Sequence, residues 1–228
     1  CRLHPSRIQR MRLSRRTTVN DHPSRVTGVF LDEQAHEAVL LIDGENYRIT
    51  EADFRTLGFS EGDWLGDGEL EAVCKAAERL RCIRKAMDCL SYGDMSGKKL
   101  LGKLTPRFDR ELAASVVELL RKRGYVDDAA LSARMAISFY ENKLWGPLRI
   151  RSELAARGFS SEDVAAALEP LETCDHTDNI RTLTEKKFGV LDLADYAQRS
   201  KAFAYLYRCG YESADITDAI SRLEQEER

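Results

Sequence analysis

The side chains best able to do chemistry are six cysteines and four histidines, and their spacing argues against a catalytic or metal site. No C-x-x-C pair occurs, and Cys174 with His176 gives fewer ligands than a structural zinc site needs. Phosphate-binding, dinucleotide-binding and zinc-protease motifs do not occur either. We therefore predict no enzyme, no cofactor and no metal, while a Cys–His or Ser–His pair formed in space stays open. The cysteines expected to be reduced and buried or half-buried are Cys1, Cys74, Cys82, Cys89, Cys174 and Cys209.

Basic residues recur in three segments and indicate a binding surface rather than a reaction centre. Residues 96–107, 146–157 and 197–208 carry net charges of +4, +2 and +3. Spacings of four residues place several of these bases on one helical face. Such a face attracts acidic protein or DNA phosphate, and phosphate binding weakens steeply with salt. The candidate partner-binding residues are Lys99, Lys103, Arg107, Arg149, Arg151, Arg157, Lys201 and Arg208.

An acidic segment follows each basic one, with net charges of −2, −4 and −2 for residues 109–120, 161–172 and 213–224. A chain whose total net charge is only −3 could thus present one basic and one acidic stripe. The alternative is that these charges only solvate the helices or complement helix dipoles, and the sequence leaves both interpretations open. Trp145 has two interpretations as well, a plug between repeats, which we favour, or an anchor for a partner.

Helices in a repeat must position these charges. Three similar segments each contain a base, an apolar residue beside it, a leucine five residues after the base and a closing aromatic residue. Their leucines, Leu104, Leu154 and Leu206, are 50 and 52 residues apart. An amphipathic helix is predicted before and after each segment, which gives three helices per repeat. The closing aromatics of the three segments are Phe108, Phe159 and Tyr211. Tyr125, Phe159 and Tyr211 close turns and are expected to pack.

The turns inside the repeats should differ between copies. Gly158 and Gly210 fall where a helix ends in a left-handed residue, whereas the first copy lacks this glycine and has Pro106 nearby. Each repeat is too small to bury much apolar surface alone, so the repeats must stack. Stacking of this kind predicts an elongated, curved protein.

The region before the repeats reads as a small β unit. Apolar runs on both sides of Asp43-Gly44 predict a hairpin, because both turn positions tolerate positive φ. Thr50 is a predicted N-cap of a short helix that ends at Gly58, and residues 60–68, with three glycines, are expected to be a loop or linker.

The predicted fold is mainly α, with three tandem three-helix repeats behind a small N-terminal β-hairpin unit. The predicted parts are a basic disordered tail (1–24), a β-hairpin with a short helix (25–68) and three repeats (69–124, 125–174 and 175–228). The tail is predicted to be a functionless extension, with a loose nucleic-acid contact as the alternative. No apolar run is long enough for a membrane span and no secretory signal is evident, so a cytoplasmic monomer is expected.

Two motifs carry a resemblance to a known family. The segments Gly124-Tyr125-Val126-Asp127-Asp128 and 146–159 resemble the central signature of the RecX family. Lys186-Lys187-Phe188 and residues 206–211 are similar to its third repeat, and the hairpin resembles the N-terminal extension of some members. The resemblance spans residues 25–226 and is most specific in the second repeat.

The resemblance implies a regulatory protein that binds RecA recombinase filaments. Family members dock in the helical groove of the filament on single-stranded DNA and limit its growth, ATP hydrolysis, strand exchange and SOS co-protease activity. An alternative is a helical-repeat protein that acts directly on single-stranded DNA, for which the basic stripe would be the evidence. An enzyme with an unrecognised site is a third interpretation, which the motifs disfavour.

Overall fold

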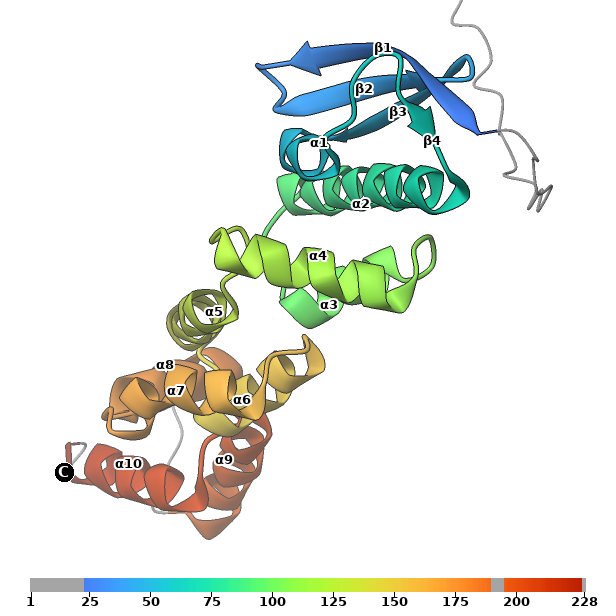
Figure 1. Cartoon of the computed structure of the whole chain (residues 1–228). Coiled ribbons are helices and arrows are strands. Elements are labelled where there is room, and N and C mark those ends of the chain that lie inside the picture. The colour runs from blue at the N-terminus through green and yellow to red at the C-terminus, as the bar shows by residue number, and fades with distance from the viewer. Residues whose placement is uncertain (1–22, 190–194, 227–228) are drawn as a thin grey trace, which may run out of the picture. The chain divides into compact units, whose positions relative to one another are not determined.

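The computed structural model describes residues 23–189 and 195–226, which form two compact units divided between Leu80 and Arg81 (Figure 1). These described residues contain four strands and ten helices. The strands lie together in the first unit as a small antiparallel sheet. The predicted fold class, mainly α with a small N-terminal hairpin unit, is confirmed.

The first unit is built on a sheet with the strand order β3-β2-β1-β4. Asp43 and Gly44 turn the hairpin between β2 and β3 with φ values of 47° and 83°, as the Asp-Gly signal predicts. Burial alternates along β2, where Ala38, Leu40 and Ile42 point into the core. The strands are β1 (Ser24–Asp32), β2 (Glu37–Ile42), β3 (Glu45–Thr50) and β4 (Trp64–Leu65).

Helix α1 (Glu51–Leu57) and the first part of α2 (Asp67–Ser91) cover one face of this sheet (Figure 1). The Thr50 hydroxyl accepts a hydrogen bond from Asp53 N at 3.0 Å, and Gly58 ends α1 in the left-handed conformation, so both predicted signals hold. The buried residues of this core are Val26, Ala38, Leu40, Ile42, Ile49, Leu65, Val73 and Ala76.

The predicted linker at residues 60–68 is wrong in part, because it contains β4 and the start of α2. Leu65 pairs with Ser24 and Trp64 with Arg25, whose guanidinium carbon lies 5.5 Å from the Trp64 ring centroid. A strand of two residues has no hydrophobic period to recognise, and the neighbouring glycines conceal it.

The second unit contains the end of α2 and eight further helices of the described chain, arranged as three-helix repeats. We call the end of α2 with α3 and α4 repeat 1, α5 to α7 repeat 2, and α8 to α10 repeat 3. Leu104, Leu154 and Leu206 are fully buried, one in the core of each repeat. The exact repeat bounds stay a prediction. The helices are α3 (Gly97–Leu104), α4 (Arg110–Lys122), α5 (Asp128–Lys143), α6 (Pro147–Ala156), α7 (Ser161–Glu172), α8 (Thr177–Phe188), α9 (Tyr196–Cys209) and α10 (Ser213–Glu226).

Short polar side chains begin several of these helices. Ser96, Asp109, Asp127 and Ser160 each accept a hydrogen bond from a backbone N–H in the first turn that follows. Each bond satisfies a donor that has no partner inside its helix, which stabilises the helix by about 1 kcal/mol. The caps therefore help to fix where α3, α4, α5 and α7 start.

Glycine at the end of the second helix joins repeat 2 to repeat 3. Gly146, at the start of α6, donates its N–H to Cys209 O at 2.9 Å, and Leu148 N donates to Gly210 O at 3.0 Å. A Cβ on Gly146 would clash with the Gly210 carbonyl group, and one on Gly210 would lie 2.5 Å from Arg149 N. The N-terminus of α6 thus abuts the C-terminus of α9, and helix-end donors meet helix-end acceptors.

A similar contact between helix ends joins repeat 1 to repeat 2, but here the donor is a serine hydroxyl instead of a backbone N–H. Ser96, at the start of α3, donates its hydroxyl hydrogen to Arg157 O at 2.7 Å, beside Gly158 at the end of α6. Asp128 adds a second link, accepting from Gly97 N at 2.8 Å and from the Arg121 guanidinium at 3.1 Å. Both predicted left-handed glycines are confirmed, with φ of 90° at Gly158 and 95° at Gly210, and the first copy ends α3 in a right-handed turn instead.

A histidine lies at the core of the joint between repeats 2 and 3. His176 is 5% exposed and packs edge-on against Tyr140 and Tyr211, and its Nδ1 lies 2.9 Å from the Tyr140 hydroxyl. Burial lowers the pKa of His176 below its usual value, while Asp215, Asp175 and Glu212 act in the opposite direction. Desolvation prevails, so the folded protein holds this imidazole neutral.

Acidification should therefore weaken the second unit. Because the unfolded chain binds a proton at His176 near pH 6.5 and the folded chain binds it only at lower pH, the free energy of unfolding should fall as pH drops below about 6.5. Urea unfolding between about pH 7.5 and 5.5 measures this slope. We expect His176→Gln to remove most of it and the matched substitution at the exposed His36, His36→Gln, to keep it. Equal slopes in all three proteins would contradict a buried neutral His176.

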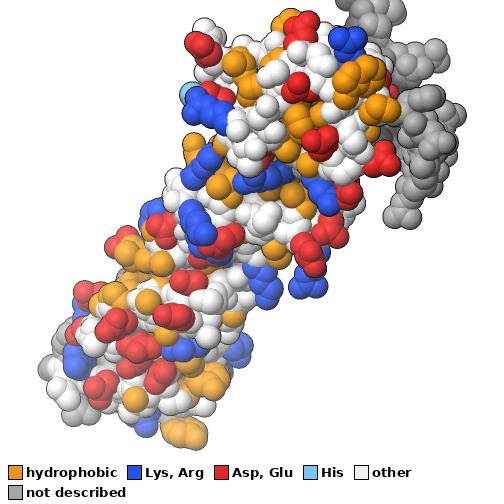
Figure 2. Space-filling model, viewed as in Figure 1, with side chains coloured by type: hydrophobic (Ala, Val, Ile, Leu, Met, Phe, Trp, Pro, Cys, Tyr) orange, Lys and Arg blue, Asp and Glu red, His pale blue; other side chains and the backbone are white. Residues whose placement is uncertain are grey.

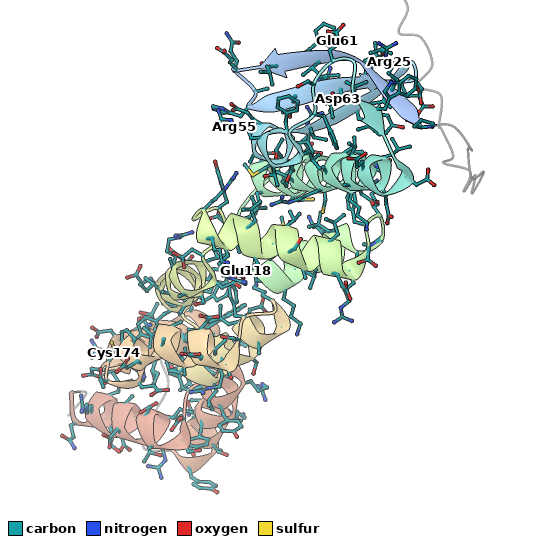
Figure 3. All side chains as sticks on the ribbon, in the orientation of Figure 1. Arg25, Arg55, Glu61, Asp63, Glu118 and Cys174 are labelled. Atoms are coloured by element: carbon teal, nitrogen blue, oxygen red, sulfur yellow. The ribbon has the colours of Figure 1, made fainter. Side chains whose placement is uncertain are left out.

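Two expectations about burial are wrong in part. Cys82, Cys89 and Cys209 are buried as predicted, but Cys74 is exposed, and so is Cys174 on the turn between α7 and α8 (Figure 3). Phe159 and Tyr211 pack in the interior, whereas Tyr125 is 55% exposed. Cys74 lies beside the buried face of α2, and Tyr125 and Cys174 lie in turns. At such positions the hydrophobic pattern does not show whether a side chain faces the core or solvent.

The predicted disordered tail lies almost wholly outside the described residues, which begin at residue 23. Among the residues that the structure describes, no helix has both the length and the apolar character needed to cross a membrane.

Candidate partner-binding surface

The second helices of the repeats, α3, α6 and α9, carry six of the eight predicted bases, and all eight side chains are exposed. Arg107 instead lies in the turn after α3, so it does not continue the helical face of Lys99 and Lys103, and Arg157 is the C-cap of α6. On α6, Ile150 and Leu154 are buried, whereas Arg149 and the C-cap residue Arg157 are exposed. The contacts at Gly158 and Gly210 join the three helices through their ends, so their bases follow one another from repeat to repeat. The second helices therefore form a row in which the end of one helix meets the start of another, and the exposed bases lie along this row.

Ion pairs neutralise two of the eight predicted bases. Arg151 donates to Glu172 on α7 at 2.9 Å, and Arg157 Nε donates to Glu153 at 2.8 Å. Between described residues, no ion pair is recorded for Lys99, Lys103, Arg107, Lys201 or Arg208. These five bases keep their charge available for a partner. Arg151 is the least suited of the eight to bind one, because its charge is paired with an acid on another helix.

Aromatic rings lie beside the bases at the end of α5, a feature that the sequence did not single out. Trp145 is half-buried and packs on Phe139, with ring centroids 5.0 Å apart. Arg149 lies over the Trp145 ring at 4.0 Å and Lys143 at 4.5 Å from its centroid. Trp145 therefore packs within repeat 2, next to the joint for which the sequence favours it, and keeps part of its surface open to solvent. The sequence did not mark Lys143 as a candidate partner-binding residue, because it falls outside the repeated segments.

Acidic side chains of the third helices form a different surface. They gather over α7 and α10 on the face that Figure 2 shows. On α4, Glu118 is paired with Arg121 at 3.0 Å (Figure 3). Glu162 and Asp163 lie in the first turn of α7, where they also complement the helix dipole, so part of this pattern has a purely structural reason.

A cavity of about 660 Å³ lies between repeats 1 and 2. Its walls carry both signs of charge, from Lys98 and Arg121 and from Asp128, Glu162 and Asp163. Arg121 and Asp128 already pair with each other. Within the described residues, no group of three histidine, cysteine or acidic side chains is arranged to hold a metal ion.

Comparison with known proteins gives the family. The model of the second three-helix domain of RecX matches residues 127–168, and that of the third three-helix domain matches residues 175–220. Regulatory protein RecX of Stenotrophomonas maltophilia (strain R551-3) is 34% identical over 138 residues, covering 60% of this chain and 83% of that relative. The chain belongs to the RecX family. The resemblance in the repeat motifs is thereby confirmed.

Other members of the RecX family agree. Regulatory protein RecX of Xanthomonas axonopodis pv. citri (strain 306) is 35% identical over 141 residues, covering 60% of this chain and 84% of the relative. A crystal structure of regulatory protein RecX has a TM-score of 0.72 at 19% identity and covers 86% of this chain and 99% of its own. RecX from Lactobacillus salivarius has a TM-score of 0.60 at 19% identity, with 66% and 99% covered. These structures show that the RecX fold is shared.

Proposed function

We propose that this chain is a non-enzymatic regulator that binds filaments of a RecA-type recombinase on single-stranded DNA and mainly inhibits recombination, ATP hydrolysis and the SOS co-protease reaction. The observation that carries the proposal is membership of the RecX family, whose relatives are named regulatory proteins. The proposed partner is the filament, met in the cytoplasm by a monomer of this chain.

The exposed bases of α3, α6 and α9 support a long contact of this kind. A filament repeats the same surface at every subunit, and successive repeats of this chain offer equivalent second helices joined at their ends. Charged contacts at the edge of an interface mainly steer association and fix register. We propose that Lys99, Lys103, Arg107, Arg149, Arg157, Lys201 and Arg208 supply these contacts, with Arg151 held back by Glu172.

Reversing two unpaired charges tests this proposal. The double variant Lys99→Glu/Lys103→Glu should need about tenfold more protein for half-maximal inhibition of ATP hydrolysis by preformed filaments, because like charges would then face each other. The matched control Lys122→Glu/Arg123→Glu changes two exposed bases at the C-terminal end and C-cap of α4, outside the proposed surface, and should inhibit like the unchanged protein. Equal inhibition by all three proteins would remove these residues from the interface.

A pull-down with the recombinase separates filament binding from direct action on DNA. The proposed function predicts capture that depends on recombinase, single-stranded DNA and ATP together. Equal binding to naked DNA, with no effect on ATP hydrolysis by the recombinase, would favour the direct-acting alternative and overturn the proposal.

A further inference from the structure

Bases and aromatic rings alternate across the joint between repeats 2 and 3. In repeat 2, Lys143 and Arg149 lie over Trp145, and Arg157 lies 5.3 Å from the Phe139 ring centroid. The Arg149 guanidinium is held at 4.0 Å from the Trp145 centroid, which stacks it between the indole and solvent. A planar cation held in this way offers its outer side to another flat group.

Repeat 3 continues the pattern. Tyr205 packs edge-on against Phe188 with centroids 5.6 Å apart, and Lys187 Nζ lies 6.0 Å from the Tyr205 centroid. Lys201 and Arg208, four residues before and three after Tyr205, share its helix face. The two halves of the pattern are neighbours, because a Cβ on Gly210, at the end of the helix that carries Tyr205 and Arg208, would lie 2.5 Å from Arg149 N.

We define the basic–aromatic surface as Lys143, Trp145, Arg149, Arg157, Lys187, Lys201, Tyr205 and Arg208. It has six cations, and the one acid that pairs with any of them in the described structure is Glu153, bound to Arg157. The cations match a chain of phosphates, and the ring and guanidinium planes match unstacked bases. An acidic protein surface would use the charges but leave the stacked planes without a role.

We propose that the basic–aromatic surface binds single-stranded DNA directly, with phosphates on its lysines and arginines and bases stacked on Arg149 and Trp145. This proposal rests on the proposed function, because the DNA would be the strand inside the recombinase filament. It deepens that function by naming the residues that contact this strand. By contrast, none of the recorded cation–π contacts of the described residues involves the bases of α3. The DNA contact is therefore placed in repeats 2 and 3.

Intrinsic fluorescence gives a direct test, because the chain has two tryptophans and the other, Trp64, is 61% exposed in the first unit. Trp64→Phe leaves Trp145 as the only indole. Titrating this full-length variant with an oligothymidine, without recombinase, should quench the Trp145 emission, and the apparent affinity should fall steeply with salt. Poly-glutamate of equal charge should quench little. No quenching by the oligothymidine, or equal quenching by both polyanions, would overturn the proposal.

Neutralising exposed bases supplies a second test that does not disturb packing. In the Trp64→Phe background, Lys187→Gln/Lys201→Gln/Arg208→Gln should weaken oligothymidine binding by about tenfold or more. The slope of log K against log salt should become shallower by about 0.7 for each phosphate that no longer meets a cation. The matched control Arg110→Gln/Lys122→Gln/Arg123→Gln removes three exposed bases from α4 and its C-cap and should keep the affinity. Equal affinities of the two triple variants would place DNA elsewhere.

The two proposals can fail separately. Filament inhibition without quenching by naked oligothymidine rejects the DNA-binding surface and leaves the regulator intact. Quenching that depends on the basic–aromatic surface, with no effect on recombinase ATP hydrolysis, rejects the regulator and leaves the DNA-binding surface.

Discussion

Replacing Gly210 with alanine is expected to lower the free energy of unfolding of the second unit by about 4 kcal/mol. The new Cβ would clash with Arg149 Cβ and lie 2.5 Å from Arg149 N, and no side-chain rotation relieves a clash with backbone. Helices α6 and α9 must therefore separate, which breaks the hydrogen bonds from Gly146 N and Leu148 N. The left-handed φ of 95° adds its own penalty of about 1 kcal/mol.

The matched control is Gly124→Ala. Gly124 has a left-handed φ of 77°, but a Cβ there would meet nothing within 4 Å. This variant should lose only the conformational penalty, about 1 kcal/mol. Urea unfolding followed by far-ultraviolet circular dichroism gives both values. Similar losses for the two variants would show that the joint between repeats 2 and 3 tolerates a side chain.

Truncating Tyr211 is expected to destabilise repeat 3 by about 3–5 kcal/mol. Tyr211 is the largest fully buried side chain of the described residues, packs on His176 and donates its hydroxyl hydrogen to Leu144 O at 3.1 Å. Tyr211→Ala removes the ring from the core of repeat 3 and the hydrogen bond that reaches back to repeat 2. Leu144 holds a left-handed φ of 55°, so this bond also helps to fix an unfavourable backbone.

Tyr211→Phe separates packing from hydrogen bonding. It keeps the ring and leaves the Leu144 carbonyl without this donor, so we expect a loss of about 1 kcal/mol. Thermal and urea unfolding of the three proteins measure the difference. A loss for Tyr211→Phe as large as that for Tyr211→Ala would assign the stability to the bond and not to the buried ring.

The repeats and their caps could be predicted from the sequence because they depend on local patterns. A leucine recurring once in each repeat, a hydroxyl before a helix and a glycine after one each follow from the needs of a single helix, as at Leu154, Thr50 and Gly158. The proposed function came from the family motifs, since composition and spacing alone indicate only a charged helical protein.

The rest depends on residues far apart in the chain. The ion pair between Arg151 and Glu172 joins two helices, and nothing local to Arg151 distinguishes it from Arg149. The stacking of Arg149 on Trp145 joins the end of α5 to α6, and the contact of Arg149 with the end of α9 arises only when repeats 2 and 3 meet. The end-to-end contact of α6 with α9 could not be derived either, because a glycine predicts a turn and not the helix that fills the space beside it.

The end-to-end contact of α6 with α9 gives the series of repeats a direction. Repeat 2 offers Gly146 N and Leu148 N to carbonyls that only the next repeat supplies. A chain shortened after α7 would leave these two amide donors exposed at the front of α6, together with an uncovered apolar surface. Repeat 2 therefore depends on repeat 3 for partners that its own helices do not supply.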